Sequence, residues 1–165
     1  MKNKFTLIII AVVVLAITGF FILKQINFPL KSAPANFNLI FRYGIGAKNE
    51  LNTFSQTYTK DMIMDPLVTV DFKLTDKELE GIYQKMNDLK LFDKKEEPAK
   101  ENMDVTPCSS YYLKIQSGSD QKELSWSDCY GKISDKLQQF TDYIIKIIES
   151  KEEYKALPKS KGGYL

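Results

Sequence analysis

The sequence predicts an α+β domain that follows one N-terminal transmembrane helix. Three observations support this fold class. An uncharged apolar run opens the chain, several later segments alternate apolar and polar residues, and two segments repeat apolar residues at helical spacing. Their order is β-β-β-α-β-β-α. We therefore expect a two-layer domain, mainly an antiparallel sheet, with two amphipathic helices on one face.

Residues 1–24 form the predicted membrane anchor. The run from Phe5 to Leu23 has no charged residue, and as a helix it would span roughly 28 Å, close to the ~30 Å hydrocarbon core of a bilayer. Few residues precede the run, so we expect a single-pass protein of the cell membrane with its N-terminus inside and its C-terminal domain outside. A cleaved signal peptide is the alternative, with Ala33-Pro34-Ala35 as the best cleavage match, but the apolar core is longer than such peptides use.

The composition excludes several classes of function. Lys+Arg is 23 and Asp+Glu is 21, so the chain lacks the basic excess of a nucleic-acid binder. Arg42 is the one arginine, and histidine is absent, which removes the commonest general base and the commonest zinc ligand. We therefore predict no nucleic-acid partner, no cofactor and no metal site. The abundance of Lys, Ile and Asn is typical of an AT-rich bacterial genome.

A proline-containing linker, residues 25–35, leads into the predicted extracytoplasmic domain, residues 36–165. Alternation from Phe37 to Ile45 predicts the first strand, and residues 46–49 form a turn. The β-formers from Leu51 to Thr59 predict one second strand. Asp65-Pro66 interrupts the chain before a third strand, from Val68 to Leu74.

Both predicted helices begin at a capping residue. Thr75 and Glu78 form a capping box ahead of a helix that we expect to end near Lys90. Ser134 caps the second helix, whose apolar spacing continues to about Lys151. The charged segment 93–107 is predicted to be a solvated loop, and the last residues, after Pro158, are expected to fray.

A hairpin near the middle of the domain fixes its own register. Residues 111–116 and 121–126 flank the turn cluster Ser117-Gly118-Ser119-Asp120. One register pairs Tyr111 with Trp126, Leu113 with Leu124 and Lys114 with Glu123. The same register places Cys108 opposite Cys129 at the open end, so we predict a disulfide between them in an exported domain.

The sheet face opposite the helices is the predicted interaction surface. An uncovered face or edge of a sheet is a natural surface for a protein or peptide partner. The residues that we predict for this interaction are Ile40, Arg42, Thr69, Asp71, Tyr112 and Lys114.

No catalytic motif rises above chance, so we expect a non-enzymatic binding or interaction domain held at the lipid bilayer by Phe5 to Leu23. Two alternatives remain open. One is a small tethered hydrolase that uses carboxylates or a serine; Asp61 with Asp65, and Ser119 with Lys122, are its nearest candidates. The other is an accessory subunit whose anchor packs within a membrane complex, although the span contains no GxxxG motif.

Overall fold

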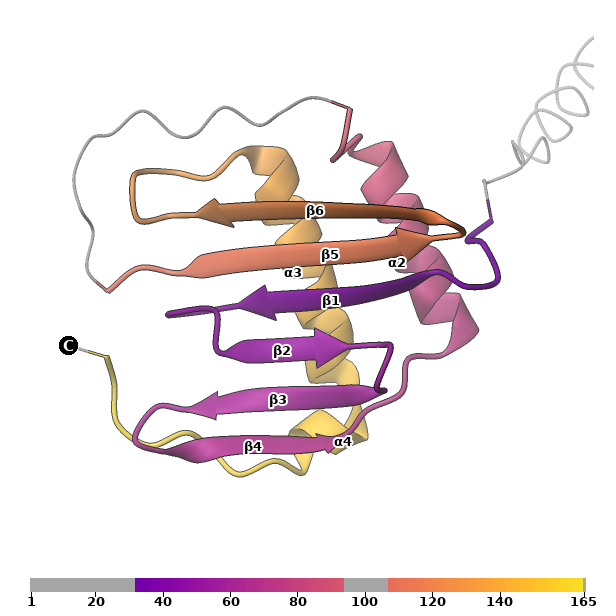
Figure 1. The fold of residues 1–165 in the computed structure, drawn as a ribbon. Helices are drawn as coiled ribbons and strands as arrows, with labels where there is room; N and C mark the ends of the chain where they lie inside the picture. Colours follow the sequence, from indigo (N-terminus) through magenta and orange to yellow (C-terminus); the bar gives the residue numbers. More distant parts are fainter. Residues whose placement is uncertain (1–31, 94–106, 165) are drawn as a thin grey trace, which may run out of the picture. The chain divides into compact units, whose positions relative to one another are not determined.

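Six strands form one antiparallel sheet, and the helices lie against one of its faces (Figure 1). The computed structural model describes residues 32–93 and 107–164. The α+β class predicted from the sequence is confirmed for this part of the chain. The elements are β1 (Asn38–Tyr43), β2 (Asn49–Asn52), β3 (Thr57–Met62), β4 (Asp65–Asp71), α2 (Asp76–Asp88), β5 (Ser110–Ser117), β6 (Asp120–Ser127), α3 (Asp135–Ser150) and α4 (Glu152–Lys155).

The strands lie in the order β4-β3-β2-β1-β5-β6. The first four strands form a meander in which each pairs with the next. Helix α2 then returns the chain to the other side of β1, where β5 pairs with β1 and β6 pairs with β5. Consequently β1 lies inside the sheet between β2 and β5, and β5 is its neighbour although a long stretch of chain separates them.

The predicted second strand is wrong, because the segment from Leu51 to Thr59 forms parts of two strands, β2 and β3. Asn52 causes the reversal: its side-chain Oδ1 accepts hydrogen bonds from the backbone N–H groups of Phe54 (3.1 Å) and Ser55 (3.2 Å). An Asx turn of this kind competes with strand pairing. Gln56 completes the turn with φ of 55°, in the left-handed region.

Strand β4 begins earlier than predicted, at Asp65 rather than Val68. Pro66 is tolerated because β4 is an edge strand, where a missing N–H costs no sheet hydrogen bond. The pairing of β3 with β4 is irregular between Lys60 and Met62. A proline and a bulge are both devices that blunt a sheet edge against unwanted strand pairing.

The core lies between the sheet and the helix layer. Leu39 and Phe41 of β1 are fully buried, and they alternate with Ile40 and Arg42, which face the other way. The helices contribute their apolar stripes to the same core, as predicted. The core residues from the helices are Ile82, Tyr83 and Met86 of α2, and Leu137, Phe140, Ile144 and Ile148 of α3.

The predicted helix starts are confirmed. Thr75 Oγ1 accepts a hydrogen bond from the Glu78 backbone N–H (3.2 Å), and the Glu78 carboxylate accepts one from the Thr75 N–H (2.7 Å). Ser134 accepts from the Leu137 N–H at the start of α3 (3.4 Å). Both caps satisfy backbone donors that a helix leaves unpaired at its N-terminus.

The C-terminal segment is held against the sheet, so the expected fraying is wrong for residues 158–164. Lys161 forms a parallel bridge with Ile63, and Ser160 Oγ donates to the Asp61 carbonyl (2.9 Å). The Tyr164 hydroxyl donates to the buried Asp61 carboxylate and accepts from Lys48 Nζ (2.9 Å). Small polar residues suggested a free end, whereas these contacts tie the end to the β3–β4 hairpin.

The predicted anchor, residues 1–24, and most of the predicted linker lie outside the described residues. Within the described part of the chain, no helix has the length and apolar character needed to cross a bilayer.

We predict that Tyr164→Phe lowers the free energy of unfolding by about 1–2 kcal/mol, because it removes a hydrogen bond to a buried carboxylate. Urea unfolding monitored by Trp126 fluorescence measures this loss. The control is Tyr130→Phe, since that ring is 51% exposed, and it should change the free energy by less than about 0.5 kcal/mol. Equal values for the two variants would contradict a structural role for the C-terminal segment.

Candidate functional site: the helix-free face and the disulfide

The six residues predicted for interaction lie on strands whose alternation places them away from the helix layer. In β1 and β5, Ile40 pairs with Lys114 and Arg42 pairs with Tyr112. These four side chains are therefore neighbours at the middle of the face that no helix covers in the described structure (Figure 1). We call this surface the helix-free face.

The other two predicted residues lie farther away. Thr69 and Asp71 belong to the edge strand β4, and β3 and β2 separate them from β1. Thr69 is directly opposite Thr59, and the two hydroxyls hydrogen-bond (2.8 Å). The structure therefore brings together four of the six predicted residues and leaves a pair at the margin.

Arg42 is fixed in place from two sides. Its Nε donates to Glu50 Oε2 at 2.6 Å, and its guanidinium lies over the Tyr112 ring, 5.6 Å from the centroid. The other oxygen of Glu50 accepts from Asn52 Nδ2 (3.3 Å), so the carboxylate itself is held. Charge-assisted contacts and stacking of this kind reduce the freedom of a long side chain before any partner arrives.

The contacts continue across β5 to β6. The Glu123 carboxylate lies 3.6 Å from Lys114 Nζ, and Glu123 is the diagonal neighbour of Tyr112 across the β5–β6 pair. The pKa of the Tyr112 phenol is raised, first by desolvation and then by the nearby Glu123 carboxylate. A connected set of side chains thus crosses four strands. We call this set the charged network: Glu50, Arg42, Tyr112, Glu123 and Lys114.

Glu50 is the functional residue that the sequence reasoning missed. It lies between the predicted turn, residues 46–49, and the predicted second strand, which begins at Leu51, whereas the structure pairs it with Arg42 inside β2. The available signal was the position of the turn: a hairpin centred on Gly46 places Glu50 opposite Arg42. Gly46 and Ala47 both have positive φ, as a tight turn requires.

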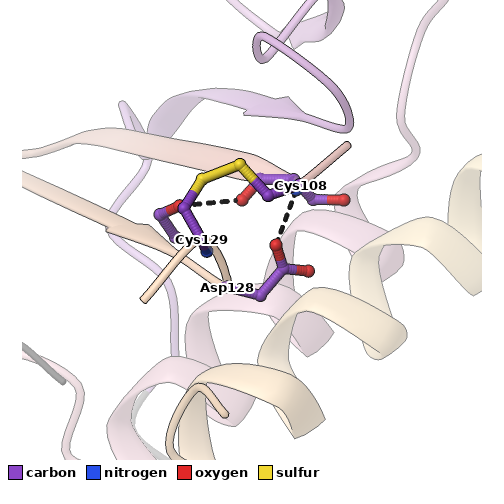
Figure 2. Close-up of a disulfide and its surroundings, with 5 residues drawn as sticks. Cys108, Asp128 and Cys129 are labelled. Carbon is purple, nitrogen blue, oxygen red and sulfur yellow. Dashed lines mark hydrogen bonds between the residues drawn. A yellow bond between two sulfur atoms is a disulfide. The ribbon is translucent and has the colours of Figure 1, made fainter. Parts of the chain in front are cut away.

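The predicted hairpin register is confirmed, and the two cysteines at its open end form a disulfide (Figure 2). Their Cα atoms are 4.9 Å apart, inside the range that disulfides occupy. Backbone pairing continues past the ends of β5 and β6 towards the disulfide, since the Asp128 N–H donates to the Ser109 carbonyl (3.1 Å). It closes a loop with a sequence separation of 21.

Asp128 lies beside the two sulfur atoms, and the three residues have ligand atoms within 4.8 Å of one another (Figure 2). The Asp128 carboxylate accepts a hydrogen bond from the Ser109 N–H at 2.6 Å. Thiolates are the form that ligates metals, and both sulfurs are bonded to each other here. We therefore interpret this cluster as one that stabilises the open end of the β5–β6 hairpin.

The candidates for a hydrolase site do not converge. Asp61 is buried and holds Tyr164 and the Ile63 N–H, while Asp65 is exposed and pairs with Lys161 at 3.4 Å. Lys122, the lysine of the Ser119–Lys122 candidate, lies over the Phe92 ring.

A cleft of about 480 Å³ contains two carboxylates, Asp71 and Glu153, but both residues are exposed. Both carboxylates are in contact with solvent, whereas a carboxyl that acts as a catalytic acid is usually held in an apolar pocket.

Comparison of the sequence with models of protein families, and with curated proteins, finds no match.

We predict that replacing both cysteines with serine lowers the free energy of unfolding by about 3 kcal/mol, because the unfolded chain loses a closed loop of about 20 residues. Urea unfolding measures the change. The matched control is the unaltered chain unfolded with a reductant, which should reproduce the variant. Thiol labelling of the unfolded, unreduced chain should find no free cysteine, and two labelled thiols would contradict the bridge.

Proposed function

We propose that this protein is a membrane-tethered, extracytoplasmic interaction domain that binds a protein or peptide partner through its helix-free face. The charged network carries this proposal. Its arginine, tyrosine and lysine are ordered by mutual contacts, yet Arg42 remains 48% exposed at the side chain. Arginine and tyrosine are enriched among the residues that dominate binding energy at interfaces, and pre-ordered side chains lose less entropy on binding.

The location outside the cytoplasm is supported by the disulfide and by the predicted anchor. Disulfides persist in oxidising compartments and are rare in the cytosol. The uncharged run from Phe5 to Leu23 provides the tether. Together they favour a single-pass protein of the cell membrane with residues 36–165 outside.

A tethered hydrolase and an accessory subunit are less well supported. The carboxylates considered for hydrolysis are either engaged in structural hydrogen bonds or exposed. An accessory role would place the main contacts on the anchor, and the anchor lacks the small-residue motif that packs helices closely. The helix-free face instead offers a preformed set of interface-type side chains.

The membrane topology is tested by adding protease to intact spheroplasts. We predict that residues 36–165 are degraded while the cells are intact, because the domain lies outside. A cytoplasmic protein serves as the control for cell integrity. Survival of the domain until lysis would contradict the proposed orientation.

The binding surface is tested by photo-crosslinking in intact cells. We predict that an uncharged photoreactive residue at Thr59 or Ser125, which flank the charged network, forms a discrete crosslinked species. The same residue at Gln139 or Lys146, exposed positions of α3, should not form that species. Identical crosslinks from both faces, or none from the helix-free face, would contradict the proposal.

A further inference from the structure

We infer that Arg42 is the specificity-determining residue of the helix-free face, and that it receives a carboxylate from a mixed-charge peptide segment of the partner. This inference rests on the proposed function and names the chemistry of the partner. It starts from the one arginine of the sequence, which the fold places on β1, at the middle of the sheet.

The guanidinium of Arg42 keeps its recognition edge available. Only Nε is used by Glu50, at 2.6 Å, and the stacking on Tyr112 occupies one flat side of the group. Within residues 32–93 and 107–164, no hydrogen bond engages its two terminal Nη groups. These groups can bind both oxygens of one carboxylate, a geometry that a lysine ammonium does not offer.

The order of charges across the helix-free face indicates which charges the partner segment carries. From β2 through β1 and β5 to β6, the network presents Glu50, Arg42, Lys114 and Glu123, which is acid, base, base, acid. Glu50 and Arg42 share one cross-strand row, and Lys114 and Glu123 share the next row, two residues along the strands. Three strand spacings of about 4.8 Å and this offset of about 6.8 Å separate the outer acids by about 16 Å. A complementary segment therefore has two acids at its centre and a base on either side.

The same order argues against two other partners. A polyanion, such as a nucleic acid or an anionic lipid surface, would meet the two outer carboxylates as well as the two bases. A second copy of this chain stacked on the same patch would place bases against bases. Like charges brought together at an interface cost binding free energy, so neither partner matches the pattern as well as a mixed-charge peptide.

The probe is the peptide Lys-Gly-Glu-Gly-Glu-Gly-Lys, and the control is its charge reversal, Glu-Gly-Lys-Gly-Lys-Gly-Glu. Alternate residues of an extended chain share one side at about 6.8 Å spacing, so the charges face the sheet together. The Cα atoms of the outer lysines are then about 20 Å apart, and their long side chains reach the remaining few ångströms inward to the acids. Both peptides have the same length, composition type and net charge. They differ only in which charges lie at the centre.

Binding is measured by NMR titration of the full chain in zwitterionic detergent micelles, with the single arginine Nε–H as the reporter. The first peptide should shift the Arg42 Nε–H and Tyr112 signals and bind at least about fivefold more tightly than the reversed peptide. Arg42→Gln should weaken its binding at least about tenfold. Arg42→Lys should still weaken it about threefold or more, because the charge remains but the bidentate geometry is lost.

Lys132→Gln is the matched control. Lys132 is 81% exposed at the side chain, and within the described residues it forms an ion pair with neighbouring Asp135 and is not part of the charged network. The affinity of this variant should equal that of the unaltered chain. Unchanged circular dichroism of each variant establishes that it is folded. Equal binding of the two peptides, no binding, or full binding by Arg42→Gln would overturn the assignment. In that case, photo-crosslinks confined to the helix-free face would still support the proposed interaction function. The absence of such crosslinks would contradict the proposed function as well.

Discussion

Burial of only one face of the sheet is the constraint on which the rest of this structure depends. In the central strand β1, Leu39 and Phe41 are fully buried, and the residues between them point to the opposite side. Since side chains of a strand alternate between two faces, this pattern fixes every pairing register across the sheet. The helix layer then covers the apolar face, and the opposite face has to be stable in contact with solvent. At the centre of that face, the charged network provides polar side chains that are stable in contact with solvent.

The features that the sequence predicted correctly were those with local causes. The capping box at Thr75, the helical stripes and the hairpin register each depend on residues that are close in sequence or paired by one turn. The incorrect predictions involved side-chain hydrogen bonds that compete with strand pairing, or contacts between residues far apart in the sequence. Asn52 redirected the chain by hydrogen-bonding two backbone N–H groups, which β-propensity does not register. Tyr164 is held by Asp61, a contact across 103 positions, and no local pattern announces it.

The candidate site was partly predictable for the same reason. Period-two alternation assigned Ile40, Arg42, Tyr112 and Lys114 to one face, and the order of the strands made them neighbours. Placing Thr69 and Asp71 far from them required the order of the strands, which alternation alone does not give. Glu50 was missed because a shift of one residue at a turn boundary decides whether a side chain lies beside Arg42 or points towards the core. The sequence therefore predicted which face of the sheet a residue lies on more reliably than which strands lie beside each other.

The central claim is that the helix-free face is covered by a partner where the protein resides. Covalent amine labelling of intact cells, compared with the purified full chain, tests it most directly, because Lys114 lies on that face and Lys146 lies on the exposed side of α3. The account predicts that labelling of Lys114 relative to Lys146 falls several-fold in cells and recovers on purification. A ratio of the two lysines that is the same in both preparations would contradict it.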